Sequence, residues 1–353
     1  MKRFVPLWMA FLFSIGWITE VSVRDGYAQT TPQADLRERY EALVERVNQL
    51  ERSVSTLGAE LISLEDRLNR VRPQPRLIYY KLPKEVTICG ERIPLEDRKV
   101  WENLNQEFIA ALGNEAQIIL WMKRVRRYFP TIERRLRELS LPDDLKYVTI
   151  TESALRPHAV SSSGAAGIWQ FIPSTGEKYG MRGYGGIDER FDFFKATEGA
   201  LSYLKFLYEE FRTWPVAIAA YNCGENRMRR EIEFQRMRNY FYLDLPLETE
   251  RYVYKIAVAK IILSDPLKYG FRLDEEEYYE PLRMDRIQVE LSEPLPMIDL
   301  AVVLQVPYKE IKEMNLHVSG EVVPTGIQFL NLPAGTTERF KAYLLLRKES
   351  GRR

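Results

Sequence analysis

The sequence has few residues that bind metals and little net charge. Its 353 residues include only two histidines and two cysteines. A four-ligand zinc site would need all four of them to converge, so we expect no structural zinc, and nothing implies another cofactor. The 51 basic and 50 acidic residues leave a net charge of +1. This balance gives no electrostatic support for a nucleic-acid partner.

Long apolar runs are also scarce, and the one at the N-terminus is short. Two basic residues precede an apolar stretch over residues 4–18, and small residues at positions 26 and 28 offer a cleavage site. The pattern predicts a signal peptide over residues 1–28. A retained membrane anchor is the alternative, which we favour less because the run is too short to span a bilayer comfortably. No cysteine lies near the cleavage site, so we expect no lipid anchor.

Export would place both cysteines in an oxidising compartment. Cys89 and Cys223 could pair there, but a disulfide also requires that their backbones lie close together in the fold. Two unpaired and mostly buried thiols are an equally good interpretation.

The most regular pattern in the sequence lies in residues 36–71. Apolar residues recur there in alternating steps of four and three, which is the repeat of a coiled coil. A strict stripe of this kind is narrower than the apolar face of a globular helix, so we expect this segment to form a homo-oligomer. Valine and leucine at the two core positions favour a parallel dimer. The alternative is one amphipathic helix on the chain's own surface.

The rest of the chain divides into a linker and two further parts. Prolines at positions 73 and 75 end the first helix, and residues 72–84 are interpreted as a linker. Residues 85–279 have a mainly helical pattern, so the predicted fold class is mainly α. Residues 286–345 form a small α/β module in this interpretation, because alternating segments flank a pair of helices that is broken at Pro307.

One carboxylate lies where an apolar side chain is expected. Pro142 and the two aspartates after it mark a helix start. The apolar face of that helix would comprise Leu145, Val148, Glu152 and Leu155. Burial on this face would raise the pKa of Glu152 and keep it protonated near neutral pH, as a general acid requires. The alternative is a carboxylate at the edge of the face, paired with Arg156.

Two further segments carry polar side chains in small or apolar surroundings. Residues 161–167 form a turn rich in serine, glycine and alanine, and Gln170 follows within an apolar stretch. Its amide could bind a ligand or cap the turn. Residues 214–224 have the proline and glycine positions of a short helix, which would end at Tyr221 and Asn222. These two side chains could face a cleft or cap the helix.

In combination, these segments resemble the family 1 lytic transglycosylases, and most closely the membrane-bound type D. The resemblance extends over about residues 85–275. Its motifs are residues 152–155, 164–176, 179–180, 188–190, 219–225 and 245–253. It implies a goose-lysozyme-like helical fold, a periplasmic location, and cleavage of the glycan strands of peptidoglycan.

The resemblance also implies roles for individual residues. Glu152 matches the single catalytic acid/base of the family. The matching substrate-binding residues are Ser161, Gln170, Tyr221, Asn222, Glu248 and Tyr252. Two positions depart from the family pattern and put the fine substrate preference in doubt, because Cys223 replaces the usual alanine and Glu250 often corresponds to arginine.

In the family mechanism, one carboxyl group performs both proton transfers. Glu152 would protonate the oxygen that links N-acetylmuramic acid to N-acetylglucosamine, while the substrate's acetamide supports the positive charge at C1. The resulting carboxylate would take the proton of the C6 hydroxyl, which closes a 1,6-anhydro ring without consuming water. Trp169 and Tyr221 would suit a wall that excludes water, or they could simply pack in the core.

Three further interpretations remain open at this point. The C-terminal module resembles a degenerate lysin-motif module, or it is a helical appendage that packs on the catalytic domain. A hydrolytic muramidase would need a second acidic group, with Glu225, Glu248 or Asp188 as candidates. A non-catalytic scaffold that binds the cell wall is the third possibility.

Overall fold

The computed structural model describes residues 32–71 and 81–350. The predicted signal peptide and most of the predicted linker lie outside the described residues. The chain divides into two units, residues 1–75 and 76–353. Within the described ranges, no helix combines the length and the apolar character that a bilayer span requires.

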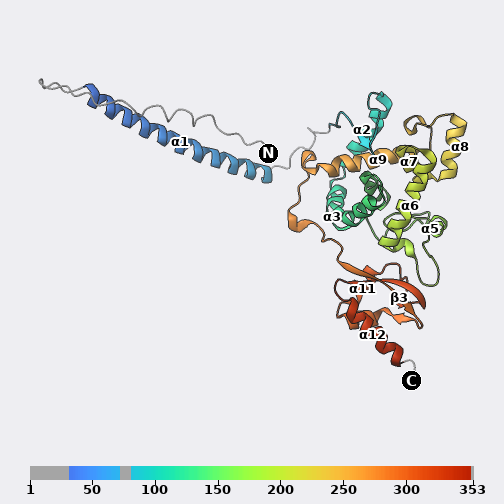
Figure 1. Cartoon of the computed structure of the whole chain (residues 1–353). Helices are drawn as coiled ribbons and strands as arrows, with labels where there is room; N and C mark the ends of the chain where they lie inside the picture. The colour runs from blue at the N-terminus through green and yellow to red at the C-terminus, as the bar shows by residue number, and fades with distance from the viewer. Residues whose placement is uncertain (1–31, 72–80, 351–353) are drawn as a thin grey trace. The chain divides into compact units, whose positions relative to one another are not determined.

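The described part of the first unit is a single helix, α1 (Pro32–Val71), drawn in blue in Figure 1. It covers the predicted heptad segment. The apolar stripe along it is exposed: Leu43 and Leu57, for example, have 63% and 64% of their surface accessible. The exposed members of the stripe are Tyr40, Leu43, Val47, Leu50, Val54, Leu57, Leu61 and Leu64. Such a face is normally buried against another helix.

The second unit begins with a domain built mainly of helices, which confirms the predicted fold class. A hairpin of β1 (Thr87–Ile88) and β2 (Glu91–Arg92) precedes them. The helices are α2 (Arg98–Leu112), α3 (Glu115–Glu138), α4 (Val148–Ser153), α5 (Pro173–Lys178), α6 (Phe193–Phe211), α7 (Trp214–Cys223), α8 (Glu225–Gln235) and α9 (Leu247–Ser264). Shorter 3-10 turns are η2 (Asp143–Tyr147), η3 (Glu189–Phe191), η4 (Tyr240–Tyr242), η5 (Pro266–Tyr269) and η6 (Glu275–Glu277).

Two helices in the middle of this domain are buried over most of their length. The stretch from Trp214 to Ala220 in α7 is buried throughout, and most of α9 is buried too. A helix that is buried to this extent must be surrounded by other elements. Accordingly, α9 packs against α2, α4 and α7, and α7 also packs against α6 and α8 (Figure 1).

The predicted helix after Pro142 is shorter and less regular than expected. It begins as the 3-10 turn η2, continues as α4, and ends at Ser153 because Ala154 and Leu155 both have left-handed backbones (φ 53° and 58°). Leu155 is therefore buried beyond the helix rather than on its face, and that part of the prediction is wrong. Glu152 still lies in the last turn of α4.

The C-terminal part of the second unit has its own strands and its own apolar core. β3 (Met284–Leu291) pairs antiparallel with β6 (Gly326–Pro333), with Ile287 opposite Leu330. A second pair joins β4 (Leu295–Pro296) to β5 (Val322–Val323). The helices are α10 (Met297–Leu304), α11 (Tyr308–Met314) and α12 (Thr337–Ser350). We call residues 284–350 the C-terminal module.

This module contacts the helical domain through backbone hydrogen bonds and through an ion pair. Ile187 and Val318 form a β-bridge, and the N–H of Asp188 donates to the carbonyl of His317 at 2.8 Å. Arg286 on β3 pairs at 2.8 Å with Asp192, which is 1% exposed and caps the N-terminus of α6. A buried carboxylate needs such a partner, because an unpaired charge is costly in the interior.

Candidate active site

All seven residues that the resemblance selected line one cavity of about 400 Å³. They are Glu152, Ser161, Gln170, Tyr221, Asn222, Glu248 and Tyr252. The cavity is formed where α4, the loop over residues 161–172, α7 and α9 meet. Other residues of its wall, such as Thr151, Tyr203 and Lys255, were missed by the sequence reasoning. Nothing in their local pattern distinguishes them from ordinary helix residues.

Glu152 contributes a carboxyl group with a raised pKa to this cavity. Burial raises its pKa to about 7, the charge of Glu248 adds to the rise, and a hydrogen bond from the Tyr252 hydroxyl opposes it. The predicted alternative, an ion pair with Arg156, is not formed within the described residues, since Arg156 Nε donates to the carbonyl of Ser153 at 3.0 Å instead. A carboxyl group with this pKa can both donate and accept a proton near neutral pH.

The loop over residues 161–172 is tightly folded on itself. Ser161 and Ala165 exchange two hydrogen bonds, from the Ser161 N–H to the Ala165 carbonyl at 2.9 Å and from the Ala165 N–H to the Ser161 hydroxyl at 3.0 Å. Gln170 has a left-handed backbone (φ 52°), and its amide nitrogen donates to the carbonyls of Gly167 and Ala159. Its nitrogen therefore caps the turn, which leaves its carbonyl oxygen for a ligand.

Arg190 holds this loop from outside the cavity. Its guanidinium donates to the carbonyls of Gly164 and Phe171 at 2.7 and 3.0 Å, and Asp188 fixes it at 2.7 Å. Gly167 lies against the backbone of Arg190, where an added Cβ would be only 2.1 Å from the Arg190 carbonyl oxygen. Asp188 is thus engaged by Arg190, and it does not line the cavity.

The end of α7 supplies two more side chains of the cavity wall. The Tyr221 hydroxyl donates to the carbonyl of Trp169 at 2.8 Å. Asn222 donates to Glu248 at 3.2 Å and accepts from Thr249 at 2.8 Å. Trp169 itself is 0% exposed, so its ring belongs to the core rather than to a cleft wall, whereas Tyr221 does line the cavity.

Glu225 is another carboxyl group in the cavity wall, and it is ionised near neutral pH. Glu225 accepts hydrogen bonds from Lys178 at 2.9 Å and from the Tyr203 hydroxyl at 2.7 Å. Burial on its own would raise the pKa of Glu225, but these two bonds outweigh it and lower the pKa to about 2. Glu152 and Glu225 therefore differ in charge near neutral pH, although they line the same cavity.

The two cysteines are unpaired thiols. Cys223 lies in the cavity wall, where burial raises the pKa of its thiol to about 11, so that it remains protonated. In the part of the chain that the structure describes, no three histidine, cysteine, aspartate or glutamate side chains are grouped to hold a metal ion.

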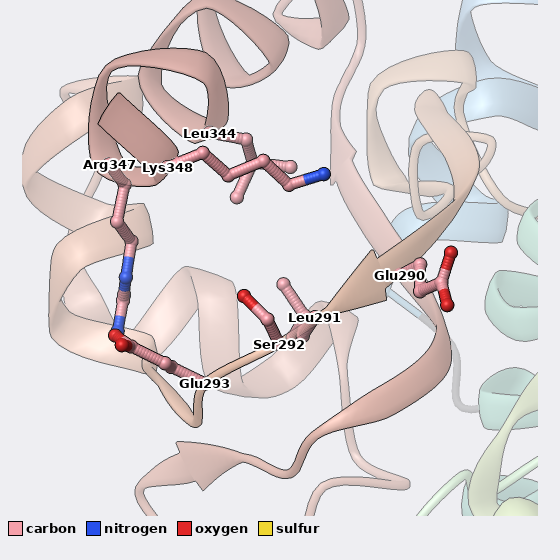
Figure 2. Close-up of a pocket in the computed structure, with 7 residues that line it drawn as sticks. All are labelled: Glu290, Leu291, Ser292, Glu293, Leu344, Arg347 and Lys348. Atoms are coloured by element: carbon pink, nitrogen blue, oxygen red, sulfur yellow. The ribbon is translucent and has the colours of Figure 1, made fainter. Parts of the chain in front are cut away.

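A separate cavity of about 360 Å³ lies in the C-terminal module (Figure 2). It is lined by side chains from the end of β3 and from α12, including Leu291, Leu344 and Lys348. It shares no residue with the cavity around Glu152.

Comparison with known proteins supports the resemblance seen in the sequence. Residues 130–242 match the family described as the transglycosylase SLT domain. The membrane-bound lytic murein transglycosylase D of Escherichia coli K12 is 32% identical over 227 residues, which cover 63% of this chain and 49% of that protein. Its counterpart from Escherichia coli O6:H1 gives the same values. The chain thus spans about half the length of these curated relatives.

Two solved structures are also similar. The 70 kDa soluble lytic transglycosylase of Escherichia coli is 20% identical, with a TM-score of 0.33 over 50% of this chain and 32% of that chain. The lytic transglycosylase Slt of Pseudomonas aeruginosa is 22% identical, with a TM-score of 0.31 over 43% of this chain and 26% of that chain.

The family model and the curated relatives agree on the kind of protein that this chain resembles. Residues 130–242 are similar to the family described as the transglycosylase SLT domain. The family resemblance predicted from the sequence is confirmed, and the relatives matched by this chain carry the name of lytic murein transglycosylase D.

Proposed function

We propose that this protein is a lytic transglycosylase that cleaves the glycan strands of peptidoglycan. One observation carries the proposal: burial raises the pKa of Glu152 to about 7, and Glu152 lies in one cavity with all six residues that the resemblance assigned to substrate binding. A carboxyl group near neutrality can act first as an acid and then as a base. The identity with lytic murein transglycosylases supports the same substrate.

The reaction needs two proton transfers, and Glu152 performs both. The protonated carboxyl group donates to the glycosidic oxygen between N-acetylmuramic acid and N-acetylglucosamine, and the bond from C1 to that oxygen breaks. The substrate's acetamide supports the positive charge at C1. The carboxylate then removes the proton of the C6 hydroxyl, whose oxygen bonds to C1. The product is a 1,6-anhydro ring, and Glu152 is protonated again.

Tyr252 positions the carboxyl group for these steps. Its hydroxyl donates to one oxygen of Glu152, which leaves the other oxygen to carry the proton. Tyr252 comes from α9 and is 3% exposed, so the packing around it restricts its movement. A donor fixed in this way also stabilises the carboxylate that forms after the first proton transfer.

A hydrolytic muramidase is the second candidate function, because Glu225 and Glu248 line the same cavity as Glu152. A hydrolase uses two carboxyl groups, one as acid and the other as base or nucleophile. Glu225 is ionised, as such a base would be, but Lys178 and Tyr203 already occupy its oxygens. This engagement favours the mechanism with one carboxyl group.

The two functions differ in their products. Purified peptidoglycan is digested with the protein that begins after residue 28, and the product ends are identified by mass spectrometry. Products that are lighter than hydrolytic ones by one water establish the transglycosylase. Reducing ends would instead establish the muramidase. Absence of products, with protein retained on the cell wall, would favour the scaffold.

We also propose that the protein is exported to the periplasm and forms a homo-oligomer through residues 36–71. The exposed apolar stripe of α1 supports the second part, because burying it against an identical helix removes that surface from water. Protein that begins after residue 28 should sediment as an oligomer, and protein that begins at Pro73 as a monomer. Equal behaviour of the two, after correction for mass, would contradict the proposal.

Point substitutions refine this prediction. Leu50→Glu together with Leu57→Glu places charges on the stripe and should give a monomer, because buried unpaired charges are costly. Arg52→Glu changes the charge off the stripe and should leave the oligomer intact. A binding partner of different sequence would show as an oligomer that forms only when that partner is present.

A further inference from the structure

A smaller chamber adjoins the cavity of Glu152. It has a volume of about 190 Å³ and lies between α2, α3, α4 and α9. Its walls are Glu107, Ala110, Ala111, Trp121, Ile150, Thr151, Lys255 and Val258. Thr151 and Lys255 also line the cavity of Glu152, so the two spaces share a wall. A substrate bound at Glu152 therefore lies next to this chamber.

Two residues of the chamber wall carry hydrogen-bond donors that have no acceptor among the described residues. The indole nitrogen of Trp121 and the hydroxyl of Thr151 are buried and lack a hydrogen-bond partner within the described part of the chain. An indole N–H can only donate, so it needs an acceptor from elsewhere. Since buried polar groups are nearly always paired, two orphans around one space indicate that something fills it.

The charges around the chamber favour an anion. Among the described residues, the ammonium group of Lys255 forms neither an ion pair nor a hydrogen bond, although the side chain is partly buried. Glu107 is the only acidic side chain of the wall, and Arg251 from α9 already pairs with it. One cation is thus left without a partner beside two unpaired neutral donors.

The size of the chamber and the other residues of its wall further restrict which kind of ligand can bind there. The chamber can hold several water molecules. Alanine, isoleucine and valine side chains form the rest of the wall, which suits a short aliphatic segment. A carboxylate at the end of such a segment would accept from Trp121, Thr151 and Lys255 together.

We propose that this chamber binds a carboxylate of the peptide that peptidoglycan carries on its muramic acid. The proposal rests on the proposed function, because it assumes that a glycan strand lies along the cavity of Glu152. It makes the enzyme recognise strands that bear peptides in preference to bare strands. Lys255 and Trp121 would then act on substrate choice rather than on bond cleavage.

The test compares two substrates for each variant. One is soluble glycan strands with their peptides, and the other is the same strands freed of peptides by an amidase. At low substrate concentration, the unaltered protein should cleave the peptide-bearing strands about tenfold faster. Trp121→Phe removes the N–H and keeps an aromatic ring, and Lys255→Gln removes the charge. Each should reduce the preference to about threefold or less.

The ratio of the two rates separates recognition from general damage. A variant that is merely less stable loses activity on both substrates by the same factor. Trp101→Phe on α2 is a matched control outside the chamber, and its preference should equal that of the unaltered protein. Equal cleavage of both substrates by the unaltered protein, or a preference that both variants retain, would overturn the proposal.

A binding measurement keeps the test independent of catalysis. The indole N–H resonance of Trp121, assigned by its loss in Trp121→Phe, should shift when a soluble muramyl peptide is added. The shift should be absent with the same sugar lacking its peptide, and weaker in Lys255→Gln. If the muramyl peptide causes no shift, the proposal that the chamber binds a carboxylate is overturned. Failure to cleave either substrate, with the shift present, counts against the proposed function only.

Discussion

Glu152→Gln should abolish cleavage of peptidoglycan, with a loss of about 10³-fold or more in turnover. Glutamine keeps the size of the side chain and its polarity, but it has no proton of suitable pKa to donate. The hydrogen bond with Tyr252 can still form, so the shape of the cavity should be preserved. Binding of glycan strands should therefore survive. The measurements are the initial rate of product formation and co-sedimentation with the cell wall.

A control variant and the pH dependence of the rate test this prediction further. Glu177→Gln, an exposed change on α5 away from the cavity wall, should retain full activity. Because Glu152 must be protonated to act as the acid and its pKa is raised to about 7, the rate of the unaltered protein should fall as the pH rises above about 7. An unchanged cleavage rate in Glu152→Gln would refute the mechanism, and hydrolysis by Glu225 or Glu248 would have to be considered instead.

Gly167→Ala should lower the free energy of unfolding by about 3 kcal/mol and reduce activity along with it. Gly167 has a left-handed backbone (φ 78°), and the new Cβ would lie 2.1 Å from the Arg190 carbonyl oxygen. Backbone cannot move aside as a side chain can, so the loop and Arg190 must separate. That loop positions Ser161 and Gln170. The measurement is urea unfolding together with the cleavage rate.

Gly164→Ala is the matched control for this change. Gly164 has nearly the same backbone conformation (φ 77°), but an added Cβ would meet nothing within 4 Å. It should cost only the backbone strain, about 1 kcal/mol. The difference between the two variants isolates the close contact with Arg190. Equal losses for both would show that this contact does not hold the loop.

Local patterns in the sequence were sufficient to predict several parts of the site. A carboxylate among apolar residues predicted the raised pKa of Glu152, even though the helix ends before Leu155. The turn predicted over residues 161–167 is present, and Gly167 within it lies against the backbone of Arg190. The helix over residues 214–223 has its proline in the first turn and ends before its glycine, as expected.

Long-range contacts could not be predicted in this way. Nothing near Gly167 in the sequence shows that its close neighbour is Arg190, and nothing near Trp169 shows that its indole nitrogen donates to Thr197 on α6. Lys255 is one of several charged residues in α9, and only the packing of α9 against α2 and α4 places it between two cavities. Such features depend on how helices pack, which a single sequence does not encode locally.

The pairing between the C-terminal module and the helical domain has a consequence for how such proteins diversify. Domains that are exchanged freely between proteins meet through flexible linkers and leave no buried charge behind. Here, loss of the module would remove Arg286 from the buried carboxylate of Asp192 and expose the apolar side chain of Ile187. Loss of the module alone is therefore expected to destabilise the helical domain, so that the two parts should be exchanged between proteins only as one unit.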